Sequence, residues 1–303
     1  MRLESFLICL AGATATGKSA LVQALAEEAG APILSADAML VYRGMDVGTA
    51  KPTRAERARV PYFGVDVVSP AEPFSAADWL REAEAARRAA EEMARPLFVT
   101  GGTGLYFSAL LRGLDPLPPR DAARCAELET LSVAELQARL GHFPEVHLPP
   151  GDWQNPRRLV RALDFLERGI PLPKAWGRGQ KPALCALTWE RAQLHERIAR
   201  RVDEMFRAGL LEETEALRAR HPVWSHTAAQ AIGYAEAGAV LDGRMTQAEA
   251  RERIVVRTRQ LARRQETYLR HQFEVTWLCV RPEDTLETLK GRFAAVQAGG
   301  PCA

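Results

Sequence analysis

Short apolar runs alternate with helical patterns over the first hundred residues of the chain. Residues 19–28 and 76–94 repeat apolar side chains at helical spacing, and Ser75 is a suitable N-cap for the second of these helices. The apolar runs between them have strand length and lie at residues 6–11, 32–36, 64–68 and 96–100. Strands that alternate with helices predict an α/β fold with a doubly wound parallel sheet flanked by helices.

The pattern changes at the Pro-rich segment 114–119. From there to residue 181 the chain shows helical pieces joined by Pro- and Gly-rich turns, with no strand pattern. We therefore expect a core domain of residues 1–114 and 182–303, and an inserted α-helical domain of residues 115–181. The expected core elements after the insert are strands at 183–189 and 274–280, and helices at 192–208, 211–220, 228–241, 246–272 and 286–296.

Composition narrows the class of protein without naming a function. The chain has 303 residues, of which 47% are hydrophobic, and its formal net charge is +2. That is enough to bury a sizeable core, and it gives no overall charge argument for nucleic acid binding. Its five cysteines are widely spaced, which argues against a disulfide framework or zinc finger, and no apolar run reaches membrane-spanning length. We expect a reduced, cytoplasmic monomer with no membrane segment.

A glycine-rich loop follows the first strand and fits the pattern G-x-x-x-x-G-K-[ST]. Such a match arises by chance in about one chain of this length per hundred. Backbone N–H groups of this kind of loop bind phosphate oxygens, assisted by the N-terminus of the following helix. Lys18 adds a positive charge, and Ser19 is the expected ligand of a Mg²⁺ cofactor. The predicted diphosphate- or nucleotide-binding residues are Gly12, Ala13, Thr14, Ala15, Thr16, Gly17, Lys18 and Ser19.

The loop does not by itself distinguish a kinase from another enzyme. Kinases and NTPases usually hold their metal or their attacking water with a second acid. The strand at 96–100 ends in Gly101, Gly102 and Thr103 and carries no acid, whereas Asp37 follows the strand at 32–36. An acid there lies at the carboxyl ends of the strands, near the loop. Asp37 is therefore a candidate catalytic residue, and a turn or cap role is its alternative.

A series of longer motifs follows the loop. In residues and order the chain resembles the tRNA dimethylallyltransferase family from about residue 8 to residue 272. It departs from the usual family pattern at Ala38, where Ser is common, and at Tyr268, where Trp is common. The motifs are Asp37-Ala-Met-Leu-Val-Tyr-Arg-Gly-Met-Asp-Val-Gly-Thr-Ala-Lys-Pro52, Phe74-Ser-Ala-Ala-Asp78, Gly101-Gly-Thr-Gly-Leu-Tyr106, Asn155-Pro-Arg-Arg-Leu-Val-Arg-Ala-Leu163, Arg201-Val-Asp-Glu-Met205, Gln230-Ala-Ile-Gly-Tyr234 and Thr258-Arg-Gln-Leu-Ala-Arg-Arg-Gln265.

The resemblance implies a P-loop fold whose helical insert grips the anticodon stem-loop of tRNA. It implies transfer of a dimethylallyl group from dimethylallyl diphosphate to N6 of the adenosine on the 3′ side of the anticodon. The catalytic residues it implies are Asp37, Thr14, Lys18 and Arg201. The tRNA-binding residues it implies are Asp37, Ala38, Met39, Leu40, Thr103, Arg157, Arg158, Arg161, Gln230, Gly233, Tyr234, Arg257 and Arg264.

Chemistry and local charge fit this interpretation. The exocyclic amine of adenine is a poor nucleophile unless a base such as Asp37 accepts its proton. Residues 251–272 carry seven arginines against Glu252 and Glu266, and helical spacing separates a cationic from an apolar face. That cationic face suits RNA phosphates, although a solvated helix surface has the same pattern.

Two other classes of function share parts of these features. A P-loop small-molecule kinase would explain the glycine-rich loop, but not the missing acid at the end of the strand at 96–100. A nucleotide-switched RNA-binding protein would explain the loop and the arginines, but the sequence contains no N/T-K-x-D motif for reading guanine. Incubation of tRNA with dimethylallyl diphosphate distinguishes all three, because only a transferase changes the mass of the RNA.

Overall fold

The computed structural model describes residues 7–114, 120–143, 148, 150–172 and 180–298. The chain divides into a core unit, Met1–Gly113 with Gln180–Ala303, and an insert unit, Leu114–Gly179. The sequence placed the two boundaries after residues 114 and 181. Residues 115–119 of the Pro-rich segment lie outside the described part of the chain.

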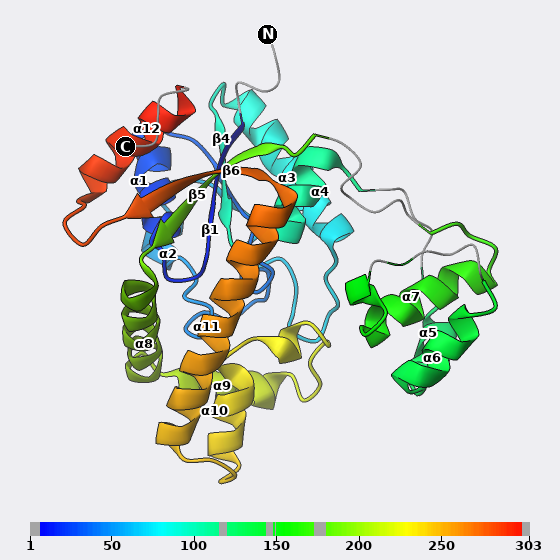
Figure 1. Ribbon diagram of the computed structural model, residues 1–303. Helices are drawn as coiled ribbons and strands as arrows, with labels where there is room; N and C mark the ends of the chain where they lie inside the picture. Colours follow the sequence, from blue (N-terminus) through cyan, green and yellow to red (C-terminus); the bar gives the residue numbers. More distant parts are fainter. Residues whose placement is uncertain (1–6, 115–119, 144–147, 149, 173–179, 299–303) are drawn as a thin grey trace. The chain divides into compact units, whose positions relative to one another are not determined.

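Six strands among the described residues form one sheet in the core unit, and all neighbouring pairs are parallel (Figure 1). Their order is β3-β2-β4-β1-β5-β6, so β1 lies inside the sheet between β4 and β5. This confirms the α/β fold with a parallel sheet. The strands are β1 Leu7–Gly12, β2 Ile33–Ser35, β3 Tyr62–Phe63, β4 Leu97–Gly101, β5 Ala183–Trp189 and β6 Glu274–Val280.

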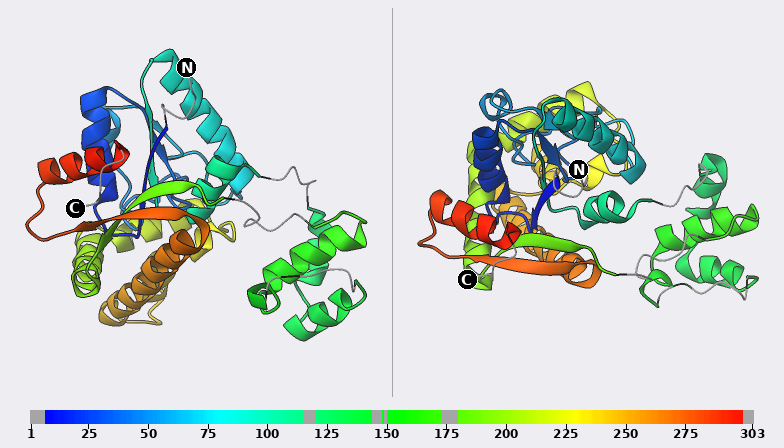
Figure 2. Two further views of the ribbon diagram at one scale, coloured as in Figure 1. Left: turned by 45° about the horizontal axis from the view of Figure 1, so that its top comes forward. Right: turned by 90° about the horizontal axis from the view of Figure 1, so that it is seen from above.

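Helices cover both faces of the sheet (Figures 1 and 2). On one face α1 and α12 pack in a cluster that includes Leu21 and Phe293, and on the other α3, α4 and α11 pack around Trp79 and Phe107. The helices of the core unit are α1 Lys18–Ala29, α2 Arg54–Arg57, α3 Ala76–Glu92, α4 Gly104–Arg112, α8 Arg191–Arg207, α9 Leu210–Arg220, α10 Tyr234–Leu241, α11 Gln247–Gln272 and α12 Leu286–Gln297.

A third apolar cluster lies beyond the carboxyl ends of the strands. Helices α8, α9, α10 and α11 contribute to it together with the segment that follows β2, including the buried side chains of Val41, Tyr42 and Met45. This cluster fixes the segment between residues 37 and 51 against helices that come from the second half of the chain. The motif that begins at Asp37 is therefore held by tertiary packing.

Three local expectations differ from the structure. The run at 64–68 is not a strand, because Gly64 and Asp66 have φ values of 70° and 55°, and the edge strand is β3 instead. The helix expected at 228–241 is divided, because Gly233 has a φ of 106° between a 3-10 turn and α10. Helix α4 was not expected. The hydrophobic pattern did not indicate this helix, because it is short and begins at Gly104, soon after β4 ends.

All regular secondary structure among the described residues of the insert unit is helical. Its helices pack around a small apolar core that includes Leu128, Leu136 and Leu159. None of the helices formed by the described residues of the chain is both long and apolar enough to cross a lipid bilayer. The elements of the insert are α5 Ala122–Leu128, α6 Val133–Leu140, a 3-10 turn at Pro150–Asp152 and α7 Pro156–Glu167.

Candidate active site

The glycine-rich loop joins β1 to α1 and is held from outside by two helices and a strand. Its backbone adopts positive φ at Ala15 (66°) and Gly17 (92°). The Trp189 indole donates to Thr16 O at 3.0 Å, and Arg197 donates from Nε to Ala15 O at 2.8 Å. Because side chains outside the loop bind these carbonyls, the loop has its curved form before any ligand arrives.

Lys18 is the buried cation of the loop. Its Nζ donates to Ala13 O at 3.1 Å, across the curve that a phosphate group would fill. The pKa of Lys18 is lowered to about 8, chiefly by burial; the Asp37 charge opposes this shift and the Arg201 charge adds to it. The structure therefore brings Lys18, Asp37 and Arg201 within electrostatic reach of one another, from three separate elements.

Asp37 follows β2 and faces the same edge of the sheet. Its Oδ1 accepts a hydrogen bond from Met39 N at 2.9 Å, so the carboxylate also shapes the turn in which it lies. The next residue, Ala38, donates from its N–H to Thr103 Oγ1 at 3.0 Å. Gly101 allows this approach, since a Cβ there would be 2.0 Å from Ala36 O. The loops after β2 and β4 thus form one surface beside Lys18.

Helix α11 connects the phosphate loop to the loop after β4 through Gln265. The Gln265 Oε1 accepts a hydrogen bond from Thr14 N at 3.0 Å. A Cβ on Gly102 would be 2.2 Å from Gln265 Nε2, and a Cβ on Gly104 would be 2.2 Å from the Tyr268 ring. Gln265 is the last residue of one of the sequence motifs, and the sequence predicted no function for it. The structure shows that it orients the backbone of Thr14.

Arg201 reaches the site from α8. One of its terminal nitrogens, Nη2, donates to Thr49 O at 2.9 Å, while its buried Nε has no hydrogen-bond partner among the described residues. A pocket of about 330 Å³ between α8 and residues 46–57 is lined in part by Arg201. A buried guanidinium with an unsatisfied N–H is suited to an anionic ligand, because a charge-assisted bond would satisfy it.

The residues predicted to bind tRNA differ in their exposure. Gln230 is exposed, and Ala38, Met39 and Thr103 are half-buried near Asp37. Leu40, Gly233 and Tyr234 are buried. The Tyr234 hydroxyl donates to Glu213 Oε1 at 2.6 Å, so this side chain supports the fold from inside. The RNA contact predicted for Tyr234 is at odds with that burial.

The cationic face of α11 is partly neutralised within the protein. Arg257 pairs with Glu236, whose side chain is 2% exposed and also accepts a hydrogen bond from Gly233 N at 3.1 Å. Arg257 therefore anchors the turn before α10, whereas Arg264 is exposed to solvent. The sequence predicted tRNA binding for both arginines, because helical spacing alone does not show which of them pairs with a carboxylate from another helix.

The three arginines of the insert that were predicted to bind tRNA lie on α7. Arg157 is exposed, and Arg158 forms an ion pair of 2.8 Å with Asp152. The Arg161 guanidinium lies over the Phe165 ring at 5.5 Å. All three therefore lie at the surface of the insert unit, and Arg158 and Arg161 already have a partner there.

One residue, Ser19, is placed as the expected Mg²⁺ ligand should be. Ser19 is exposed at the start of α1, next to Lys18, where its hydroxyl would meet a metal bound to a diphosphate. Among the described residues there is no group of three or more His, Cys, Asp or Glu side chains placed to hold a metal ion. A cation at Ser19 would therefore depend on oxygens from the bound diphosphate.

Known proteins resemble this chain over most of its length. A tRNA dimethylallyltransferase from Bordetella pertussis is 43% identical over 297 residues, covering 88% of this chain and 90% of the relative. One from Anaeromyxobacter dehalogenans is 41% identical over 302 residues, covering 94% and 96%.

Solved structures agree with this likeness. The full-length tRNA isopentenylpyrophosphate transferase from Bacillus halodurans superimposes with a TM-score of 0.69 at 32% identity, covering 97% of each chain. A eukaryotic dimethylallyltransferase acting on tRNA shares the fold, with a TM-score of 0.74 at 20% identity, covering 97% of this chain and 80% of that one.

Family models place the chain more directly. A model described as isopentenyl transferase matches residues 5–61, and one described as IPP transferase matches residues 40–272. The first match contains the phosphate loop and Asp37, and the second spans most of the chain and contains the later motifs up to Gln265. The chain therefore belongs to the IPP transferase family, as its resemblance to the tRNA dimethylallyltransferases predicted.

Proposed function

We propose that this chain transfers the dimethylallyl group of dimethylallyl diphosphate to N6 of the adenosine on the 3′ side of the tRNA anticodon. The products are N6-(dimethylallyl)adenosine and diphosphate. The observation that carries the proposal is the convergence of Lys18, Asp37 and Arg201 at the phosphate loop of a chain from this family. A cationic group for the leaving diphosphate and a base for the attacking amine are what the reaction requires.

The phosphate loop would hold the donor by its diphosphate. Lys18 supplies positive charge from inside the loop, and Arg201 supplies it from the side, through the N–H that lacks a partner among the described residues. The Thr14 backbone is held by Gln265, and the Thr14 side chain would bind the bridging region of the diphosphate. Ser19 would hold Mg²⁺, which when bound stabilises the charge that develops on the leaving group.

The acceptor base must leave its stack before its amine can reach the donor. As N6 forms a bond to the allylic carbon, the bond from that carbon to the diphosphate oxygen breaks, and the electron pair leaves with the diphosphate. Asp37 takes the proton that N6 releases. The turn that Asp37 itself stabilises through Met39 N keeps its carboxylate at the edge of the site.

The tRNA would be gripped by exposed arginines outside the reaction centre. Arg264 on α11 and Arg157 on the insert are exposed and suited to phosphate contacts with an anticodon stem-loop. Half-buried Ala38, Met39 and Thr103 border Asp37, where the flipped base would pass. We expect the chain to act as a monomer in the cytoplasm.

The test is the mass of the RNA. Unmodified tRNA is incubated with the protein, Mg²⁺ and dimethylallyl diphosphate, and the expected product is heavier by one dimethylallyl group less one hydrogen. Digestion to nucleosides then identifies the modified adenosine. A kinase would instead consume ATP and leave the RNA unchanged, and a nucleotide-switched binder would bind the RNA without changing its mass. Unaltered tRNA under these conditions contradicts the proposal.

A further inference from the structure

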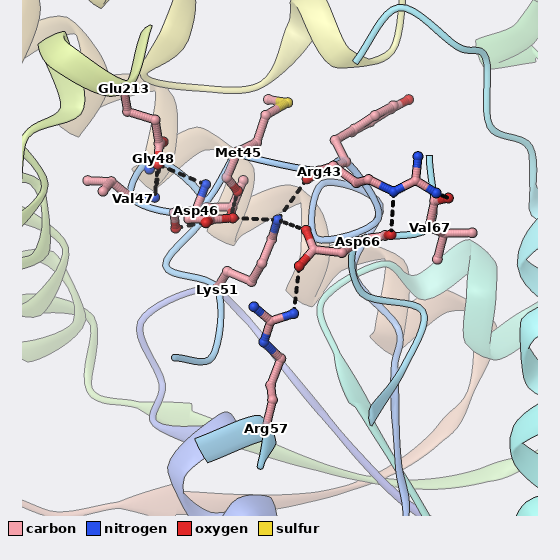
Figure 3. A network of polar contacts seen from close by, with 12 residues as sticks. Arg43, Met45, Asp46, Val47, Gly48, Lys51, Arg57, Asp66, Val67 and Glu213 are labelled. Carbon is pink, nitrogen blue, oxygen red and sulfur yellow. Dashed lines mark hydrogen bonds and ion pairs between the residues drawn. The ribbon is translucent and has the colours of Figure 1, made fainter. Parts of the chain in front are cut away.

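A carboxylate that belongs to none of the sequence motifs lies behind the segment after β2. Glu213, on α9, accepts hydrogen bonds from three successive backbone N–H groups (Figure 3). The shortest distances are 3.1 Å from Asp46 N, 2.9 Å from Val47 N and 3.3 Å from Gly48 N. A carboxylate that binds three consecutive N–H groups fixes both the position and the curvature of that backbone.

Tyr234 adds a fourth donor to the same carboxylate. Its hydroxyl lies 2.6 Å from Glu213 Oε1. Burial and the nearby Glu213 charge raise the pKa of Tyr234, so the hydroxyl remains protonated and donates at any ordinary pH. A Cβ on Gly48 would be 2.5 Å from the Tyr234 ring, so the backbone passes directly over that ring. Glu213 is therefore held by three backbone N–H groups and by the Tyr234 hydroxyl.

Lys51 holds the other side of the same segment. Its side chain is 1% exposed, and its Nζ donates to Tyr42 O at 2.7 Å and pairs with Asp46 and Asp66 at 2.7 Å and 2.6 Å. Figure 3 shows Lys51 and Glu213 reaching the segment from different directions. The residues between them, Asp46 to Ala50, are consequently clamped between the buried ammonium of Lys51 and the half-buried carboxylate of Glu213.

The clamped segment carries the carbonyl that binds Arg201. Thr49 lies one residue after the three amides held by Glu213, and Thr49 O accepts the 2.9 Å hydrogen bond from Arg201 Nη2. Any shift of the segment would therefore move the partner of the guanidinium. Arg201 also affects the pKa of Lys18, so its placement matters for both cations of the site.

We propose that Glu213 is a positioning residue for the transfer reaction, which sets the direction of the Arg201 guanidinium through the backbone of residues 46–49. The inference rests on the proposed function, in which Arg201 binds the leaving diphosphate. Glu213 touches neither substrate. Its effect is carried by the three amides and the Thr49 carbonyl.

The first experiment replaces Glu213 with Gln, which keeps the shape of the side chain but removes its charge and one acceptor. Binding of inorganic diphosphate is measured by titration calorimetry, because it reports the Arg201 site without requiring transfer. We expect Glu213→Gln to weaken diphosphate binding by about 10-fold, the effect of roughly one charge-assisted hydrogen bond. Glu215→Gln, an exposed glutamate on the same helix, is the matched control and should bind like wild type.

A double-mutant cycle separates positioning from general support. If Glu213 acts through Arg201, Glu213→Gln should weaken diphosphate binding further by less than 2-fold or so in an Arg201→Ala background. Tyr234→Phe, which removes one donor and keeps the ring, should give a smaller loss than Glu213→Gln in the same assay. Circular dichroism melting of each variant verifies that the fold is retained.

Two results would overturn the inference. Wild-type diphosphate affinity in Glu213→Gln would show that the segment does not depend on the carboxylate. Additive losses in the double mutant would show that Glu213 supports the fold independently of Arg201. Neither result contradicts the proposed function, because transfer to tRNA is measured separately with the wild-type protein. Conversely, if the wild-type protein failed to modify tRNA, the diphosphate affinities would still show whether Glu213 acts through Arg201.

Discussion

The pH dependence of donor use follows from the burial of Lys18. The pKa of this lysine is lowered to about 8, chiefly by burial, so its charge is present below that pH and lost above it. Since kcat/KM reports the free enzyme, it should follow the protonated fraction of Lys18. That fraction is about nine-tenths at pH 7 and about one-tenth at pH 9, so kcat/KM for dimethylallyl diphosphate should fall roughly 10-fold between them.

The assay is the initial rate at saturating tRNA and varied donor, from about pH 6.5 to about pH 9.5. Lys18→Arg is the control, because a guanidinium stays protonated and the high-pH limb should disappear. Arg201→Ala should move the limb to higher pH, since Arg201 lowers the pKa of Lys18, and Asp37→Asn should move it to lower pH. A flat wild-type profile, or an unchanged limb in Lys18→Arg, would refute the reasoning.

Other variants test the base and the arginines. Asp37→Asn can still accept the hydrogen bond from Met39 N, so both substrates should bind while single-turnover transfer slows by about 10²–10⁴-fold. A rate near that of wild type would remove Asp37 from the chemistry. Arg264→Ala should reduce the slope of log tRNA affinity against log salt by roughly 0.7–0.9, and an unchanged slope would make this side chain ordinary solvated surface. Arg257→Ala should instead lower the free energy of unfolding by about 1–3 kcal/mol, because the buried Glu236 carboxylate loses its nearest cationic partner and keeps only the more distant Arg253. Equal urea midpoints for that variant and wild type would contradict this structural role.

Local sequence determined most of the framework. The alternation of apolar runs and helical patterns predicted the parallel sheet, because both periodicities are properties of short segments. The same holds for the phosphate loop, whose glycines and Lys18 are adjacent in the chain. The N-cap at Ser75 was also predictable, since its side chain accepts from Asp78 N three residues later.

Short-range patterns failed where one or two backbone angles decided the outcome. The run at 64–68 has strand composition, yet positive φ at Gly64 and Asp66 turns it out of the sheet. The break at Gly233 within an otherwise helical stretch has the same origin. A glycine tolerates helical and left-handed backbone alike, so only its packing partners decide which of them it adopts.

The chemistry of the site was decided by tertiary structure. The motifs named Asp37, Lys18 and Arg201 as candidates, but only the strand order and the packing of α8 bring them together. Glu213 carries no sequence signal, because its partners are backbone amides more than 160 residues earlier, and backbone amides are the same in every residue. Arg257 and Arg264 look alike in sequence, and the distinction between them depends on a carboxylate from α10 that only the folded chain places beside one of them.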